Sequence, residues 1–207
     1  MHEICTKKSC EDHKTQNSFP LKKFYLFSVL IILFLSFSIK KNKDEIKWEK
    51  DLKIKWENFR GTPNSYNSFY ANTNSGMSFL KFGDEDSAYF TVTAVFYAKK
   101  SWVRLKFAQD TLLKHEQLHF DISELFARKF RERLFQLNKT KTTYNEDFDK
   151  IRNDIVAGHD AYQDKYDQET EHCMNVLKQA EWSEKITSEI AALDKFSAED
   201  VRIACKR

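Results

Sequence analysis

Alternation of apolar and polar positions predicts strands in the first half of the chain. Residues 52–56 read LKIKW, a period-two pattern typical of a half-buried strand. Residues 69–82 favour strand at both ends, with a turn predicted at 72–76. Residues 88–98 are rich in β-branched and aromatic side chains, which favour strand. The pattern therefore predicts a small sheet ahead of the helical part of the chain.

Helical periodicity dominates the second half of the chain. It predicts a helix over about 109–137, a second long helix over about 146–179 and a shorter helix over 183–195. Steps of 100° per residue place His115 and His119 together on the apolar stripe of the first helix, which we expect to face the core. We expect an α+β fold in which the small N-terminal sheet packs on the first helix and the second long helix lies beside it.

A hydrophobic segment near the N-terminus predicts membrane targeting. Residues 24–39 carry no charge and have lysines on both flanks, so the positive-inside rule does not set an orientation. The segment is either a signal anchor that stays or a signal peptide cut after Ser36-Phe37-Ser38. We expect a polar leader over 1–23 and a functional body over 44–207. The protein is then either anchored in the cell envelope or released as a secreted or periplasmic protein.

Composition narrows the classes of function. The chain has 34 Lys and Arg against 31 Asp and Glu, a net charge of +3, which describes a mixed surface. That balance lacks the concentrated basic face of a nucleic-acid binder, so we expect no nucleic-acid partner. With 4 Cys the chain is not a disulfide scaffold. Cys173 and Cys205 both lie in the body and are candidates for a pair, although Cys173 falls on an apolar helix stripe where free Cys is common.

The strongest chemical signal is HEQLH at residues 115–119. On a helix, His-Glu-x-x-His places two imidazoles one turn apart on one face, where both can bind one Zn²⁺. Glu116 then lies beside the metal, where it can take a proton from water and pass it to a leaving amine. The pattern predicts a zinc site with His115 and His119 as ligands and Glu116 as the catalytic base.

A catalytic zinc needs a third protein ligand, and spacing alone leaves it open. The metzincin spacing would put a third His at position 125, which is Leu125, so that subclass is excluded. Glu124 points away from His115 on a straight helix. The second long helix offers Glu169 and His172, which lie three residues apart on neighbouring faces.

Other polar residues are weaker candidates for the site. His159 and Asp160 form a further choice for the third ligand. Asp121 leaves the apolar stripe and is expected to support the site from outside or to lie at the surface. Asp167 is expected to lie on a solvated polar face of its helix.

The run LLKHEQLHFDISELFARK at 112–129 resembles the signature helix of the domain-of-unknown-function 922 family, described as predicted secreted zinc-dependent proteases of the zincin group. Further resemblance is seen in KIKWENFRG (53–61), ANTNSGM (71–77), FYAKKSWV (96–103), YDQETEH (166–172) and QAEW (179–182). The resemblance implies a zincin-like fold, Zn²⁺ as cofactor, His115 and His119 as ligands and Glu116 as base. It also favours His172 over Glu169 as the third ligand.

The resemblance adds three finer expectations. Similar sequences often have Gly where this chain has Cys173. The strand 88–98 is the candidate edge strand for binding a substrate backbone. Tyr166 is a candidate donor of a hydrogen bond to the developing oxyanion.

The sequence therefore predicts a zinc-dependent peptidase that acts on a peptide or protein substrate and is attached to the membrane through residues 24–39 if these are not cleaved. The alternative is a non-catalytic, membrane-tethered envelope protein with a structural zinc site. The number of ligands distinguishes the two: three leave a position for water, whereas four close the site.

Overall fold

The computed structural model describes residues 44–63, 65, 68–83, 87–137 and 144–204, all of them within the compact unit Asn42–Arg207. The leader 1–23, the hydrophobic segment 24–39 and Cys205 lie outside the described residues, so the predictions about them stay predictions. Within the described ranges, no helix combines the length and the apolar character needed to cross a membrane.

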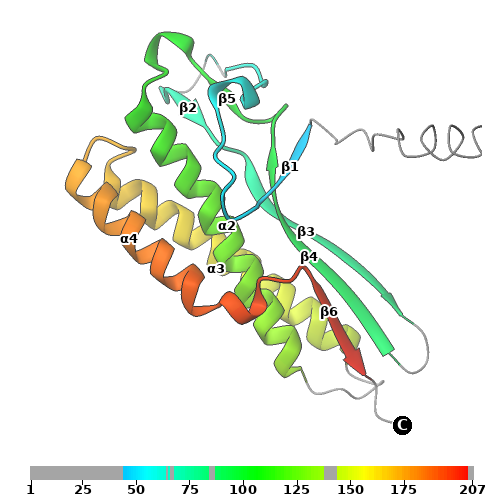
Figure 1. The fold of residues 1–207 in the computed structure, drawn as a ribbon. Helices are drawn as coiled ribbons and strands as arrows, with labels where there is room; N and C mark the ends of the chain where they lie inside the picture. The colour runs from blue at the N-terminus through cyan, green and yellow to red at the C-terminus, as the bar shows by residue number, and fades with distance from the viewer. Residues whose placement is uncertain (1–43, 64, 66–67, 84–86, 138–143, 205–207) are drawn as a thin grey trace, which may run out of the picture. The chain divides into compact units, whose positions relative to one another are not determined.

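In the described part of the chain, most strands come before the three long helices, an arrangement typical of an α+β fold (Figure 1). In chain order they are β1 (Glu45–Lys47), η1 (Trp56–Asn58), β2 (Ala71–Asn72), β3 (Ser75–Gly83), β4 (Ser87–Tyr97), β5 (Trp102–Val103), η2 (Leu105–Phe107), α2 (Asp110–Gln136), α3 (Tyr144–Thr170), α4 (Val176–Ala192), η3 (Asp194–Phe196) and β6 (Asp200–Ala204).

Strand β4 is the centre of the main sheet. It pairs with β3 along its length, from Ser75↔Phe96 to Gly83↔Ala88, in an antiparallel hairpin. Its other side is shared by β1 and by β6, which are far apart in the sequence. A second, two-stranded sheet joins β2 to β5. The strand predicted at 88–98 is confirmed within one residue.

The strand predicted at 52–56 is wrong. Residues 52–55 form no regular element, and a short 3-10 helix begins at Trp56. The backbone N–H of Ile54 donates to Oε1 of Gln117 on α2 at 2.8 Å instead of to a neighbouring strand. Ile54 is buried in the core and Leu52 and Trp56 are partly buried against it, so the apolar positions of the segment face the core without forming a strand.

Helix α2 lies between the sheet and the other long helices (Figure 1). It agrees with the predicted range of 109–137 to within a residue at each end. Asp110 in its first turn and Arg133 in its last turn complement the helix dipole. Its fully buried apolar side chains are Phe120, Ile122, Leu125, Ala127, Phe130 and Leu134. The helix that carries the HEQLH motif is therefore the core element of the fold.

The helix predicted at 146–179 is two helices. Helix α3 ends at Thr170, and α4 begins at Val176 after a turn in which Glu171, His172 and Cys173 all have positive φ. The side chain of Asn175 then caps α4 by accepting the N–H of Lys178 at 3.2 Å. This reversal packs both α3 and α4 on α2.

Gly158 allows α3 to pack closely on α2. A Cβ at this position would lie 3.2 Å from Cε1 of Phe126, which is closer than ordinary van der Waals contact. The close packing brings the next turns of α3, with His159, Gln163 and Asp167, beside the histidines of α2.

Candidate metal centre

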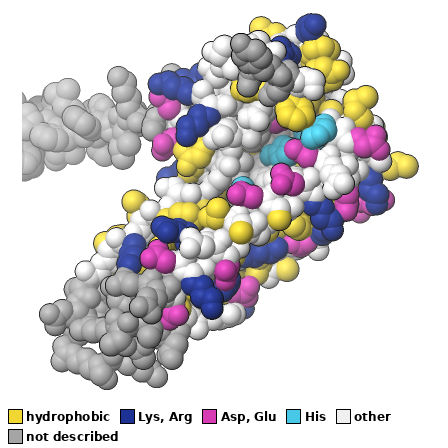
Figure 2. Space-filling model, turned by 180° about the vertical axis from the view of Figure 1, so that it is seen from behind, with side chains coloured by type: hydrophobic (Ala, Val, Ile, Leu, Met, Phe, Trp, Pro, Cys, Tyr) yellow, Lys and Arg dark blue, Asp and Glu magenta, His cyan; other side chains and the backbone are white. Residues whose placement is uncertain are grey.

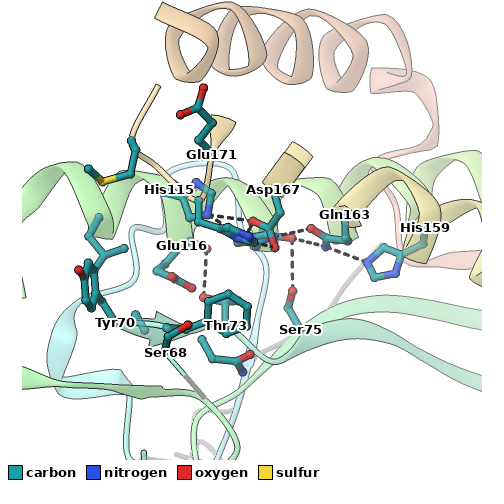
Figure 3. A pocket seen from close by; sticks show the side chains of 17 residues that line it. Ser68, Tyr70, Thr73, Ser75, His115, Glu116, His159, Gln163, Asp167 and Glu171 are labelled. Carbon is teal, nitrogen blue, oxygen red and sulfur yellow. Dashed lines mark hydrogen bonds and ion pairs between the residues drawn. The ribbon is translucent and has the colours of Figure 1, made fainter. Parts of the chain in front are cut away.

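Three side chains from two helices place their ligand atoms together. Nε2 of His115 and Nε2 of His119 lie 3.2 Å apart. Oδ1 of Asp167 lies 3.1 Å from the first nitrogen and 3.0 Å from the second (Figure 3). Tetrahedral ligands at about 2.0–2.1 Å from zinc are about 3.3 Å from one another. The observed separations are slightly shorter than this, so the three ligand atoms need to move apart only slightly to hold a metal ion.

Two glutamines fix which nitrogen of each imidazole faces this group. Nδ1 of His115 lies 3.0 Å from Oε1 of Gln179, and Nδ1 of His119 lies 2.6 Å from Oε1 of Gln163. An amide oxygen only accepts hydrogen bonds, so each Nδ1 carries the proton. In a neutral ring, Nε2 then presents a lone pair to the centre of the group, as metal ligation requires. In the metal-free protein, a ring with a second proton on Nε2 is a cation and donates to Asp167 instead.

The orientation of the Gln163 amide is fixed by its other partners. Nδ1 of His159 lies 2.9 Å from Oδ1 of Asp160, so this nitrogen donates and Nε2 of the same ring accepts. The Gln163 amide nitrogen donates to that Nε2 at 3.1 Å and to the backbone oxygen of His119 at 2.9 Å. The amide oxygen is left to face Nδ1 of His119, which completes a chain of four side chains from the surface to the metal group.

The electrostatics of the group suit a cation. Burial would lower the pKa of His119, but its hydrogen bond with Asp167 and the charges of Asp167 and Glu116 outweigh burial and raise it. Burial would raise the pKa of Asp167, but hydrogen bonds from His115 and His119 hold that pKa well below its usual range. Asp167 is therefore ionised at neutral pH. A proton and a metal ion compete for Nε2 of His119, and the negative charge of Asp167 attracts both.

Glu116 lies in the same cavity and is poorly satisfied. Its Oε2 is buried and has no hydrogen-bond partner among the residues that the structure describes. Leaving a buried carboxylate oxygen without a partner costs about 1–3 kcal/mol or more. Neither the two imidazoles nor Asp167 donates to it. A water or a substrate that reached this oxygen would relieve that cost.

The cavity around the group has a volume of about 440 Å³. In Figure 2, histidine side chains are visible on one face of the molecule with hydrophobic side chains beside them. The lining comes from the segment leading into β2 and β3, from α2 and α3, and from the turn after α3: Ser68, Phe69, Tyr70, Ala71, Asn72, Thr73, Ser75, Leu112, His115, Glu116, His119, His159, Gln163, Asp167, Glu171, His172 and Met174. Thr73 and Ser75 tie this segment to α2 by donating to the backbone oxygens of Glu116 and His119.

The structure places the two candidate third ligands differently. His172 lines the cavity, with Nδ1 3.6 Å from Oδ2 of Asp167 and its side chain 53% exposed. Glu169 accepts a hydrogen bond from Nε1 of Trp182 at 2.8 Å and does not line the cavity. The group able to hold a metal ion among the described residues takes Asp167 instead. The expectation that Asp167 lies on a solvated face is wrong.

Tyr166 does not serve the cavity with its hydroxyl. The side chain is fully buried, and its hydroxyl donates to Oε1 of Gln179 at 2.8 Å. Its ring stacks on His115 with centroids 4.7 Å apart and meets His119 edge-on at 4.9 Å. Tyr166 therefore packs behind both imidazoles, and its predicted role as an oxyanion donor does not fit this geometry.

The weaker candidates also have other partners. Nε2 of His159 is shared by Ser123 at 3.1 Å and by Gln163, so it is not part of the ligand group. Asp121 accepts from Nε1 of Trp48 at 2.8 Å and from Gln117 at 2.9 Å. Glu124 is buried and pairs with Arg128 and Arg131, so it does not face the metal group, as its helical position predicted.

The edge strand expected at 88–98 is the central strand of its sheet and has partners on both sides. The strands that line the cavity are β2 and the start of β3 at Ser75. The N–H of Arg104 donates to the carbonyl of Tyr70 at 2.8 Å, and Ala71 lies opposite Val103. Bonded and non-bonded pairs alternate in an antiparallel ladder, so the N–H and C=O of Ala71 point away from β5. No described strand pairs with that edge of β2.

Sequence reasoning missed Asp167, Gln163 and Gln179 as members of the site. For Asp167 and Gln179 the signal was present in the YDQETEH and QAEW segments of the resemblance, which contain them. For Gln163 there was no signal beyond its position one turn before Asp167 on α3.

Comparison with known proteins gives one match. Residues 96–173 match the family model described as bacterial protein of unknown function (DUF922). This confirms the family resemblance over that part of the chain, which contains the HEQLH motif at 115–119 and the YDQETEH segment at 166–172. No curated protein and no solved structure matches the chain.

Proposed function

We propose that this protein is a zinc-dependent peptidase with a zincin-like active site, exported or held at the membrane by residues 24–39. The observation that carries the proposal is Glu116: its unpartnered carboxylate oxygen is buried in the wall of the cavity that contains the three ligand atoms. A site that only holds a metal has no use for such a group, whereas hydrolysis needs a base there.

The ligand group fits zinc in number and type. Two neutral imidazoles and one carboxylate are a common donor set for catalytic zinc, and three ligands leave a fourth position open. Bound there, zinc would acidify water and polarise a carbonyl group. We assign His115, His119 and Asp167 as the residues that hold it, and Gln163 and Gln179 as the residues that orient the imidazoles.

The chain's own residues supply the remaining steps. Glu116 takes a proton from the attacking water and returns it to the amine of the leaving peptide. We assign to His172, which lines the cavity and contacts the Phe69 ring, the hydrogen bond to the carbonyl oxygen that was first expected of Tyr166. The edge of β2 that no described strand pairs with is our candidate for hydrogen bonds to an extended peptide backbone, in place of the strand 88–98.

The alternative of a structural zinc in a non-catalytic envelope protein needs a closed set of four ligands. Cys173, the residue after His172, could supply a thiolate to such a set, but it lines a different cavity, together with Lys53 and Val176. Glu169 is engaged by Trp182. The geometry thus favours an open site.

The test combines metal content with hydrolysis. The purified full chain is loaded with zinc, and its metal content and its cleavage of a mixed peptide library are measured by elemental analysis and mass spectrometry. Glu116→Gln should retain one zinc per chain and lose cleavage by at least about 100-fold. Glu132→Gln, on the same helix but away from the cavity, is the matched control. Equal cleavage by the Glu116→Gln protein would refute the proposal.

A further inference from the structure

Large apolar side chains are exposed where the cavity opens. Phe69 and Tyr70, in the segment before β2, are each 44% exposed, and Met174 in the turn after α3 is 69% exposed. All three line the cavity that contains the ligand group. Figure 2 shows hydrophobic side chains beside the histidines on this face. Exposed apolar side chains that gather around a concave site mark a surface that binds apolar groups.

The two aromatic side chains, Phe69 and Tyr70, are held in place by their neighbours. The ring of Tyr70 stacks on Phe107 with centroids 3.9 Å apart, and the ring of Phe69 packs on His172 at 4.9 Å. Nε of Arg104 donates to the backbone oxygen of Phe69 at 3.0 Å. A wall fixed in this way loses little conformational entropy when a ligand binds, which favours affinity.

The charges of the cavity disfavour acidic ligands. Its carboxylates are Glu116, Asp167 and Glu171, and no Lys or Arg is found among the described residues that line it. A divalent cation in the ligand group would offset the charges of Glu116 and Asp167 and leave Glu171 at the rim. An acidic side chain entering beside the apolar wall would meet a carboxylate and find no basic residue to pair with.

We propose that the site selects peptides with a large apolar residue, aromatic or long aliphatic, next to the bond that is cleaved, and rejects Asp and Glu there. This inference rests on the proposed peptidase function and names its substrate class. The apolar side chain would lie against Phe69, Tyr70 and Met174. An extended peptide backbone along β2 would bring one of its side chains to this wall, because side chains alternate along a strand.

The test uses zinc-loaded full-length protein and a peptide library in which every residue type is sampled on both sides of each bond. Cleavage sites read by mass spectrometry should be enriched in Phe, Leu, Met and Tyr and depleted in Asp and Glu by about tenfold or more, the discrimination that an apolar pocket can supply. Met174→Lys should weaken the apolar preference and improve cleavage beside acidic residues. Leu177→Lys, at a 79% exposed position outside the cavity, should leave the preference unchanged.

A binding measurement separates this inference from the proposed function. Zinc-loaded Glu116→Gln protein is titrated with two peptides that differ only in one Leu-to-Asp exchange, and the Leu peptide should bind at least about tenfold more tightly. Cleavage or binding without an apolar preference, or equal effects of Met174→Lys and Leu177→Lys, would overturn the inference and leave the peptidase standing. Tighter binding of the Leu peptide without any cleavage by the unmutated chain would support the inference and remove the proposed function.

Discussion

His119 and Gln163 are joined by two hydrogen bonds that fix both side chains at once. Nδ1 of His119 donates to the Gln163 amide oxygen at 2.6 Å, and the amide nitrogen donates back to the His119 carbonyl at 2.9 Å. Because His159 also accepts from that amide nitrogen, the amide has one satisfactory orientation. Gln163 thereby keeps the Nε2 lone pair of His119 directed at the metal group.

This relationship predicts that metal affinity depends on the acceptor at position 163. Gln163→Met keeps the length of the side chain but removes the acceptor, and should weaken zinc binding by about 10–100-fold. Gln163→Glu keeps an acceptor for Nδ1 but loses the N–H groups donated to the His119 carbonyl and to His159, so zinc should bind less tightly than in the unmutated protein and more tightly than in Gln163→Met. Competition with a chromophoric chelator measures both affinities.

The control for this pair is Gln168→Met, at an exposed position on the same helix. It should bind zinc like the unmutated protein. A merely structural role for Gln163 would weaken binding in the Met and Glu variants alike, which is the result that would contradict the assignment.

Much of the fold followed from local pattern, and the failures have physical causes. The helix α2 was predictable because its apolar positions repeat at helical spacing over 27 residues. The break at Glu171–Cys173 was not predictable from the sequence. Three non-glycine residues adopt a left-handed backbone there, and the segment has no Gly or Pro, the residues that usually indicate a helix end. The strand β6 was missed because its partner is β4, more than a hundred residues away.

The site was predictable where it depends on one helix. His115, Glu116 and His119 are fixed relative to one another by helical geometry, and the motif alone places them. Asp167 joins them only because α3 crosses α2 closely at Gly158, and this crossing is a property of the tertiary packing. The sequence therefore indicated the metal-binding helix but not the residue that the second helix delivers.

The left-handed turn after α3 predicts an unusual effect of glycine. Cys173 has φ of 75°, a conformation that costs an ordinary residue about 1–2 kcal/mol and glycine almost nothing. Cys173→Gly should therefore be about 1 kcal/mol more stable to unfolding than Cys173→Ala, a difference of about 2–4 °C in Tm for a body of this size. This fits the glycine that similar sequences often have here.

Thermal unfolding of the two Cys173 variants measures this difference. Ala180→Gly, at an exposed position inside α4, serves as the control and should lower stability by about 1 kcal/mol, because glycine is unfavourable in a helix interior. If glycine were destabilising at both positions, the left-handed conformation of Cys173 would be wrong.

The pKa shifts at the ligand group predict opposite pH dependences with and without metal. The raised pKa of His119 contributes stability that is complete below its ordinary value of 6.5 and is lost as the pH rises through the higher folded value. The lowered pKa of Asp167 contributes stability that is present above its ordinary value of 3.8 and is lost as the pH falls below it. The metal-free protein should therefore lose stability from this pair above pH 6.5, whereas stabilisation by zinc should grow as His119 loses its proton.

Thermal unfolding between pH 5 and pH 8.5, with a chelator or with excess zinc, separates these two trends. The difference in Tm between the two conditions should widen steadily with pH. Asp167→Asn removes the charge that raises the pKa of His119, so it should flatten the alkaline decline of the metal-free protein. A zinc effect that is constant across this range would contradict the assignment of His119 as a ligand.

Zinc retention by Asp167 and His172 variants distinguishes the ligand that the sequence favoured from the one that the structure brings to the group. Oδ1 of Asp167 lies within 3.1 Å of both Nε2 atoms, whereas the His172 imidazole is half-exposed and nearest to the other oxygen of Asp167. Asp167→Ala should therefore lose its zinc on dialysis, while His172→Ala should keep one zinc per chain and lose cleavage activity. Asp164→Ala, exposed on the same helix, should retain both. Elemental analysis reads the outcome, and zinc lost from His172→Ala but retained by Asp167→Ala would restore His172 as the third ligand and require the turn after α3 to move toward the metal.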